Sequence, residues 1–237
     1  EYVQSLGLGD TLVKLYGRWD KASDIDWDRL PNQFVLKVNN GCGDILICRD
    51  KDKLDKATVI DTYDRLVSIK YGDVTGEPHY ARIQPCVIAE ELLDINKQSI
   101  NTSSLIDYKV WCLNGKPYCI WCAWNRGKEG ADTGVYDLDW NYHPEWSVFT
   151  EHYRQGKEIL PKPKCFERML EVASKLSEEF PILRVDLYEV NEKIYFGELT
   201  FTSLGGFMDY LTSEILLDMG SKVRINEISE EYVHVKC

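Results

Sequence analysis

Residues 184–206 read RVDLYEVNEKIYFGELTFTSLGG. Its aromatic and branched residues favour two short strands, and the polar break at 191–193 favours a hairpin between them. Side chains alternate from face to face along a strand, so Asp186 and Glu198 can point into the same space if the strands pair. Two carboxylates held this close repel each other unless a cation lies between them. Magnesium is commonly held by one or two carboxylates together with substrate phosphates.

The same residues are also compatible with a half-buried hairpin whose two acids simply face solvent. Arg184 shares a strand face with Asp186, and Thr200 shares one with Glu198. These neighbours do not decide between a metal site and ordinary surface acids. The rest of the chain does.

Composition and charge limit the class of protein. The chain has 237 residues, of which 44% are hydrophobic and 12% aromatic, which indicates a folded protein with one large domain or two closely packed ones. A formal net charge of −11 disfavours nucleic acid or an anionic membrane as a partner, although a local cationic pocket remains compatible with it. No apolar run approaches the roughly 20 residues that span a bilayer, and no secretion signal is evident, so we expect no membrane insertion. The first residue is Glu1 rather than Met, which leaves open that the chain is part of a longer protein.

The eight cysteines lie mostly within apolar, strand-like runs. Cys119 and Cys122 have the CxxC spacing, but an odd separation on a strand places them on opposite faces. No second CxxC and no HxxxH accompanies them. We therefore expect buried thiols in a reducing cytosol rather than a zinc site.

Residues 33–48 contain two apolar runs, QFVLKV and DILIC, on either side of the glycine-rich segment NNGCG at 39–43. This order predicts a hairpin whose glycines let backbone N–H groups approach a ligand and form a nest for an anion. Lys37 lies within an apolar run, where a charge is costly without a partner, and a phosphate would provide one. A surface hairpin with Lys37 on its solvent face is the alternative. The segment is not a Walker loop, because GK[ST] does not follow.

The middle of the chain adds two more strand segments. Residues 53–70 have helical spacing, and IQPCVIAEELL at 83–93 predicts a strand that ends in Glu90-Glu91, either as a hinge for an adenine or as an ordinary strand end. DYKVWCLNGKPYCIWCAWNR at 107–126 predicts a hairpin around Asn114-Gly115.

The remaining stretches are less regular. We expect a short helical segment near the N-terminus, a long loop over 127–163, an amphipathic helix over 164–180 and a further helix over 209–220 that Gly220 ends.

Taken in order, the motifs FVLKVNNGCG, IAEELL, DYKVWCLNGKP and RVDLYEV…IYFGELTFTSLGGF resemble the ATP-grasp superfamily, and specifically its TupA-like family of teichuronopeptide and capsular polysaccharide biosynthesis, over roughly residues 10–220. The resemblance implies an α+β ATP-grasp fold, in which two α+β subdomains with mainly antiparallel sheets sandwich the nucleotide. It divides the chain into a reduced N-terminal segment at 1–30, a lid-like subdomain with the glycine-rich hairpin at 31–93, and a catalytic subdomain with the metal site at 94–237.

The resemblance also implies the cofactors ATP and Mg²⁺. Lys37 would hold the phosphates, the 39–43 loop would close over them, the 89–92 segment would be the adenine hinge, and Asp107 would take the ribose hydroxyls. The implied cofactor-binding residues are Lys37, Asn39, Asn40, Gly41, Cys42, Gly43, Ala89, Glu90, Glu91, Leu92 and Asp107.

The implied metal ligands are Asp186, Glu198 and Thr200, and the implied catalytic residues are Arg184, Lys109 and Arg126. By the resemblance, Arg184 stabilises an acyl phosphate and a tetrahedral intermediate, while the other two basic residues lie near the γ-phosphate and the acceptor carboxylate. The superfamily usually has Asn at the position of Thr200, so the third ligand implied here is a weaker neutral one. Only some 30 residues precede the first motif, so the N-terminal domain found in many members is reduced or missing.

The function implied is an ADP-forming, ATP-dependent carboxylate–amine ligase in the bacterial cytoplasm. It would form an amide through an acyl phosphate, joining an amino acid or amine to a uronic acid or amino acid of a surface polysaccharide or capsule. Its expected partners are a sugar-acid or amino-acid acceptor and an amine donor, with other polysaccharide-synthesis enzymes as candidates and without nucleic acid. The alternatives are a sugar kinase on the same fold and a non-catalytic nucleotide-binding module of a glycan-assembly complex.

Overall fold

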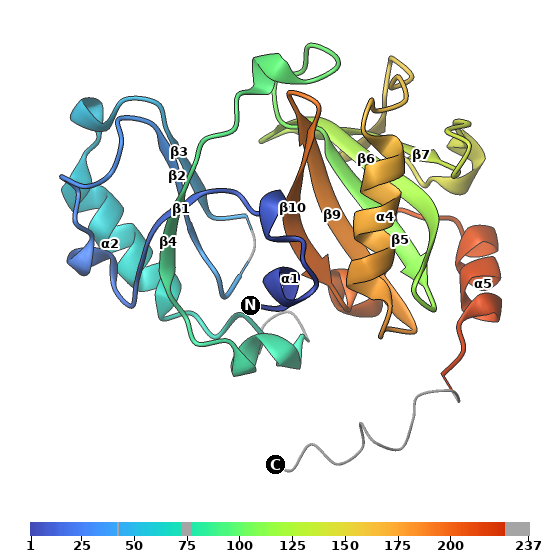
Figure 1. The fold of residues 1–237 in the computed structure, drawn as a ribbon, viewed down its shortest axis with the longest axis horizontal. Helices are drawn as coiled ribbons and strands as arrows, with labels where there is room; N and C mark the ends of the chain where they lie inside the picture. The colour runs from blue at the N-terminus through green and yellow to red at the C-terminus, as the bar shows by residue number, and fades with distance from the viewer. Residues whose placement is uncertain (42, 73–76, 226–237) are drawn as a thin grey trace. The chain divides into compact units, whose positions relative to one another are not determined.

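The computed structural model describes residues 1–41, 43–72 and 77–225 (Figure 1). The chain divides into two compact units. The smaller unit comprises residues 13–93, and the larger unit combines residues 1–12 with those from 94 onward. The segment 1–30 is therefore shared between the two units.

The described part of the smaller unit contains a four-stranded antiparallel sheet in the order β1-β4-β2-β3. Helix α2 (Lys56–Val67) covers one face of this sheet, and its first turn is capped by Asp55, which accepts a hydrogen bond from the backbone N–H of Thr58 at 3.2 Å. Phe34 and Leu36 of β2 point to the helix and are fully buried. The strands are β1 (Leu15–Trp19), β2 (Phe34–Val38), β3 (Ile45–Cys48) and β4 (Val87–Glu90).

The opposite face of the smaller sheet carries Val35 and Lys37, which alternate with the buried residues of β2. In the antiparallel register Val35 is paired with Glu90 and Lys37 with Ile88, so these four side chains share the face. The neighbouring Ile45 of β3 is 58% exposed. This face thus combines apolar area with charged side chains, among them Lys37 and Glu90.

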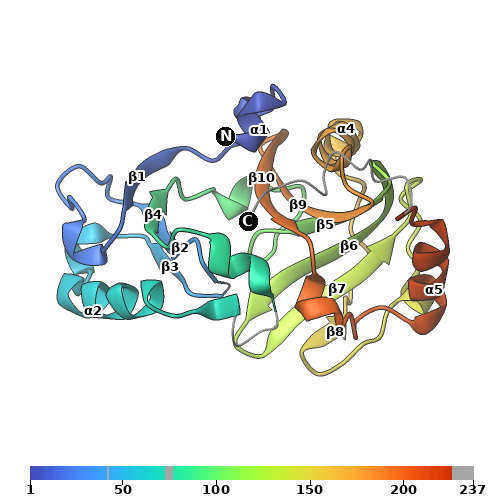
Figure 2. The same ribbon diagram turned by 90° about the horizontal axis from the view of Figure 1, so that it is seen from below.

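The described part of the larger unit contains a six-stranded sheet in the order β10-β9-β5-β6-β7-β8, in which β7–β8 is parallel and the other pairs are antiparallel (Figure 2). Helix α4 (Phe166–Ser177) packs on one face and helix α5 (Ser213–Lys222) on part of the other. The strands are β5 (Asp107–Leu113), β6 (Lys116–Gly127), β7 (Gly130–Tyr136), β8 (Tyr153–Gln155), β9 (Ile182–Val190) and β10 (Lys193–Thr200).

The α4 side of the larger sheet is the main hydrophobic core. Tyr108 and Val110 of β5 meet Met169 and Leu176 of α4 in this core, and Leu176 is completely buried. Burying such a side chain contributes roughly 1.5–3 kcal/mol relative to exposure. The carboxylate of Glu189 on β9 accepts hydrogen bonds from two backbone N–H groups at the start of α4, at 3.1 and 3.3 Å.

Several local predictions are confirmed. The hairpin turns at Asn114-Gly115 and Asn191-Glu192 have positive φ at both residues of each pair, as the two-residue turn that joins twisted strands requires. The predicted helices at 53–70 and 164–180 correspond to α2 and α4. Cys119 and Cys122 are free, buried thiols in the cores on opposite faces of the sheet.

Two local predictions are wrong, and one strand was not predicted. The stretch 127–163 is not one long loop, because it contains β7 and β8, whose short lengths and glycines hid the strand pattern. The short helix expected near the N-terminus is α1 (Tyr2–Ser5), but strand β1, which follows it, was not predicted. Gly220 lies inside α5 rather than ending it, since the cost of about 1 kcal/mol for a glycine is offset by buried Ile215 and Met219.

Within the described residues, no helix combines the length and the apolar character needed to cross a membrane.

Candidate functional site

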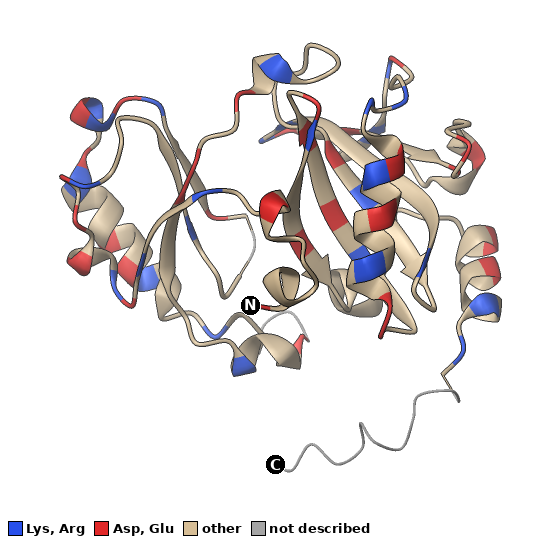
Figure 3. Cartoon of the chain, viewed as in Figure 1, with Lys and Arg blue, Asp and Glu red and all other residues tan. Residues whose placement is uncertain are grey.

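Charged side chains gather on the face of the larger sheet that is opposite α4. Acidic and basic residues lie together on these strands in Figure 3. Lys109 of β5 is in register with Asp186 of β9, which is in register with Glu198 of β10. The two carboxylates predicted to share a space are therefore directly opposite each other.

A β-bulge between Phe196 and Glu198 places Glu198 opposite Asp186. Gly197 is the bulged residue, and a Cβ there would lie 3.0 Å from the backbone oxygen of Asp186 and 3.1 Å from the ring of Tyr188. A larger residue would push the two strands apart. Gly197 therefore allows the bulge that brings the carboxylates of Glu198 and Asp186 opposite each other.

The charged groups form a continuous network. The ammonium of Lys109 pairs with Asp107 at 2.7 Å and also with Asp186, and Arg126 pairs with Asp107 at 3.0 Å. Arg184 binds Asp186 with two hydrogen bonds, Nε to Oδ1 at 2.7 Å and Nη2 to Oδ2 at 2.8 Å. All of these groups except Arg126 are buried. Breaking a buried pair by removing one partner leaves an uncompensated charge, so the members depend on one another.

The guanidinium of Arg184 also reaches the second carboxylate. Its Nη2 lies 3.2 Å from Oε1 of Glu198, which in turn accepts a hydrogen bond from the hydroxyl of Thr200 at 3.0 Å. The ring of Trp111, in register with Arg184 on β5, lies 6.0 Å from the guanidinium carbon. A cation therefore lies between the two carboxylates, and it is Arg184.

The network shifts the pKa values of its members. Burial would raise the pKa of Asp186, but Lys109 and Arg184 outweigh it and lower the pKa to about 2. Burial lowers the pKa of Lys109, yet Asp107 and Asp186 more than compensate and raise it. These groups therefore stay charged at neutral pH.

Glu198 behaves differently. Desolvation is the main cause, and repulsion from Asp186 the second, of the raised pKa of Glu198. Since 55% of its side chain is exposed, solvent screens this effect. Glu198 is thus the most accessible carboxylate of the pair.

The donor set fits a magnesium ion that binds with a nucleotide. Among the described residues, no three His, Cys, Asp or Glu side chains cluster in a way that could hold a metal ion by themselves. Asp186 and Glu198 supply two carboxylates, and Thr200 is a neutral oxygen beside them. Two carboxylates completed by phosphate oxygens and water are typical of magnesium.

Asp107 has an unsatisfied atom. Its Oδ2 binds Lys109 and Arg126, but its buried Oδ1 has no hydrogen-bond partner in the described part of the chain. A buried carboxylate oxygen without a donor is costly, so a ligand hydroxyl would fit there.

The smaller unit holds the phosphate-binding candidates. Lys37 is paired with Glu90 at 2.6 Å, so a neighbouring strand supplies the partner that its position in an apolar run requires. Asn39 accepts from the N–H of Cys86 at 2.7 Å, and Asn40 donates to the carbonyl of Ile69 at 3.0 Å. These two amides fasten the hairpin to the rest of the unit.

The other candidates of the smaller unit are distributed along the same elements. Gly41 packs against the ring of Tyr71, and Gly43 has a φ of +89°, which glycine adopts without strain. Cys42 lies outside the described residues. Ala89 faces the α2 core, Glu91 donates its N–H to a backbone carbonyl at 2.9 Å, and Leu92 is half-buried beyond the end of β4.

The sequence prediction missed three polar residues of the charged face. Tyr188 lies two residues after Asp186 on β9, so strand periodicity could have placed it on the charged face. The charge of Asp107 is the main cause, and burial the second, of the raised pKa of Tyr188. Ser203 and Tyr210 reach the network only through the tertiary fold, and no sequence pattern indicates that they do.

Comparisons with known proteins place this arrangement in a family. The solved structure of D-alanine–D-alanine ligase from Bacillus anthracis matches with a TM-score of 0.52 at 16% identity, covering 94% of this chain and 64% of that one. The same ligase complexed with ATP matches with a TM-score of 0.49 at 15% identity, covering 94% and 62%. A family model described as TupA-like ATPgrasp matches residues 1–224.

This chain belongs to the TupA-like ATP-grasp family. The α+β fold is the ATP-grasp fold, as the resemblance implied. The TupA-like chain spans slightly less than two thirds of the solved ligase it matches. A comparison with curated proteins finds no match.

Proposed function

We propose that this TupA-like ATP-grasp protein is an ADP-forming, ATP-dependent carboxylate–amine ligase. The observation that carries the proposal is the pairing of Asp186 with Glu198 in a network with Lys109 and Arg184. In this proposal the acceptor is a uronic acid or amino acid of a bacterial surface polysaccharide and the donor is an amine, which is the substrate class that the resemblance of the sequence motifs implies. The free, buried thiols fit a reducing bacterial cytoplasm.

The nucleotide-binding residues that the resemblance implies keep their roles in this proposal. Lys37 and the N–H groups of the 39–43 hairpin bind phosphate oxygens, and the backbone of 89–92 pairs with the adenine. The apolar area around Val35 and Ile88 accommodates the base. Oδ1 of Asp107 accepts a hydrogen bond from a ribose hydroxyl, which satisfies its unpartnered atom.

The chemistry activates an inert carboxylate. A carboxylate oxygen of the acceptor attacks the γ-phosphorus, the bond to the bridging oxygen breaks, and ADP leaves with an acyl phosphate formed. The amine nitrogen then attacks the acyl carbon, phosphate leaves, and the nitrogen loses a proton to give the amide.

Anions approach each other in the first of these steps. Arg184, Lys109 and Arg126 offset that repulsion, and each well-placed donor is worth about 3–4 kcal/mol. Asp186, Glu198 and Thr200 would hold Mg²⁺, which neutralises phosphate charge when bound.

Purified protein incubated with Mg-ATP, uronic acids and amino acids tests the proposal. We expect ADP, phosphate and an amide product by mass spectrometry, and none of them with Glu198→Gln. Formation of AMP would contradict the mechanism. A stable phosphorylated sugar without amide would instead identify a sugar kinase on the same site.

A specific observation favours one further candidate function, a nucleotide-binding module without catalysis. Thr200 donates its hydroxyl to Glu198 at 3.0 Å, so in this structure it acts as a partner of the carboxylate. Under this alternative, Mg-ATP raises the melting temperature while turnover stays absent with every acceptor.

A further inference from the structure

A chain of buried hydroxyl groups ends on Arg184. Nη1 of Arg184 donates to Oγ of Ser203 at 2.8 Å, and that oxygen lies 2.9 Å from the hydroxyl of Tyr210. Ser203 and Tyr210 are each 4% exposed and Arg184 is 9% exposed. Neither hydroxyl contacts the carboxylates of the site, so this chain is separate from the metal-binding set.

The hydrogen bonds of Arg184 show what the hydroxyl chain adds. An arginine has five N–H donors in a rigid plane. Nε–H and one Nη2–H bind Asp186, the other Nη2–H reaches Glu198, and one Nη1–H binds Ser203. Four of the five donors therefore bind oxygens of Asp186, Glu198 and Ser203, and the hydroxyl of Tyr210 also interacts with the guanidinium. Ser203 holds the Nη1 edge of the guanidinium, while Asp186 and Glu198 hold the Nη2 edge.

Tyr210 is itself held firmly. Its ring packs against Trp121 at 4.8 Å and against Tyr153 at 6.0 Å. Its backbone carbonyl accepts from the N–H of Val148 at 3.0 Å, and the next residue bridges to Ser147. The segment 144–148 thus anchors the residue that supports Ser203.

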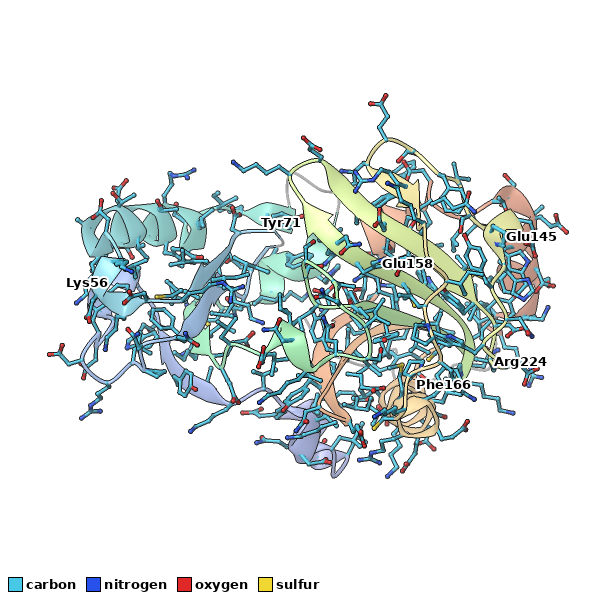
Figure 4. The ribbon with its side chains drawn as sticks, turned by 90° about the horizontal axis from the view of Figure 1, so that it is seen from above. Lys56, Tyr71, Glu145, Glu158, Phe166 and Arg224 are labelled. Carbon is cyan, nitrogen blue, oxygen red and sulfur yellow. The ribbon has the colours of Figure 1, made fainter. Side chains whose placement is uncertain are left out.

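The neighbouring loop reinforces this anchor. His143 stacks on Trp146 at 3.8 Å, and its ring nitrogen lies 2.7 Å from Glu145, labelled in Figure 4. The carbonyl of Trp146 accepts from the N–H of Thr212 at 3.0 Å, two residues after Tyr210. The 127–163 stretch therefore acts on the site through the backbone around Tyr210.

We propose that Ser203 and Tyr210 are positioning residues, which hold the Nη1 edge of Arg184 and so keep its guanidinium oriented towards the reacting acyl group. The inference about the acyl group rests on the proposed ligase function. The holding of Nη1 does not, because it concerns hydrogen bonds within the chain. Burial raises the pKa of Tyr210, so the phenol keeps the proton that it can donate to Ser203.

Arginine side-chain ¹⁵N NMR tests the positioning directly. In the full chain we expect resolved, slowly rotating Nη1 protons for Arg184. In Ser203→Ala these protons should average while the Nε–H signal bound to Asp186 persists, and Ser203→Thr should restore them. Tyr210→Phe should have an intermediate effect. Unchanged Nη1 signals in Ser203→Ala would overturn the proposal.

Kinetics tests the consequence for the reaction. Misplacing a catalytic group by about 1 Å can cost up to about 100-fold in rate, so Ser203→Ala and Tyr210→Phe should lower kcat by about 10- to 100-fold. The KM for Mg-ATP should change by less than about twofold, because ground-state nucleotide contacts are intact. An equal loss in both parameters would contradict the proposal.

Tyr136→Phe is the matched control. Its hydroxyl is also buried in the larger unit and accepts from the N–H of Leu160 at 2.9 Å, but it lies in the α4 core on the opposite face. We expect Tyr136→Phe to lower the melting temperature while kcat and the Arg184 signals stay unchanged. A fall in kcat or a change in the Arg184 signals would overturn the proposal, because it would show that removing any buried hydroxyl has this effect. If wild-type protein forms no amide with any acceptor, the ligase function fails, whereas the NMR result still decides whether Ser203 holds Nη1.

Discussion

The two faces of the larger sheet are built from the same strands and serve different ends. On β5, Tyr108 and Val110 face α4 within an apolar core, while Asp107 and Lys109 face the charged network. Side-chain alternation produces both faces from one stretch of chain. The apolar face gives the stability that allows the other face to bury ionised groups, which by themselves contribute little net stability. We therefore expect substitutions on the two faces to separate folding from activity.

Asp186→Ala should have the largest effect on folding. It leaves Lys109 and Arg184 buried without their shared carboxylate, and removing one partner of a buried pair costs about 3–5 kcal/mol. Chemical denaturation should show this loss, together with absent turnover. A loss below about 1 kcal/mol would mean that the network is far more hydrated than its burial indicates.

Leu176→Ala should destabilise the apolar face by about 2–5 kcal/mol through the cavity it creates, with kcat unchanged at temperatures where the protein is folded. Denaturation and a turnover assay on the same preparation measure both quantities. A fall in kcat without loss of stability would break the proposed division between the faces.

Lowering the pH should remove part of the stability. The pKa of Asp186 is depressed in the folded protein to about 2 from an ordinary value of 3.8, so its contribution is complete above about pH 4 and is lost as the pH falls towards 2. A shift of this size corresponds to roughly 2 kcal/mol. The free energy of unfolding, followed from pH 5 to pH 2, should show a smaller decline in Asp186→Asn than in the wild-type protein. Equal declines would assign the acid sensitivity to other groups.

Glu198→Ala should have the smallest effect on folding, less than about 1 kcal/mol, because more than half of the side chain is exposed. Metal-dependent turnover should nevertheless disappear. A large fall in melting temperature would instead indicate a structural role for this carboxylate.

The sequence predicts the parts of this site that depend on local rules. Strand alternation and the Asn191 turn were enough to predict that Asp186 and Glu198 lie on paired strands and can point into the same space. The bulge at Gly197 that sets the final register was not evident, because glycine in a strand has several uses.

The missed features depend on contacts between distant segments. Ser203 and Tyr210 matter because of where α5 and the 144–148 segment pack, and Glu90 pairs with Lys37 across two strands far apart in sequence. Strand β7 was missed because its glycines weaken the alternation that identifies a strand. Local periodicity carries no information on such partners.

The most direct test of the magnesium-nucleotide site is calorimetric titration of Mg-ADP into the wild-type protein, Leu176→Ala and Glu198→Ala. If the face opposite α4 is the site of the magnesium nucleotide, Leu176→Ala should bind as the wild type does, while Glu198→Ala should lose most of its magnesium-dependent affinity. Magnesium-dependent binding that is the same in Glu198→Ala and the wild type would contradict the assignment.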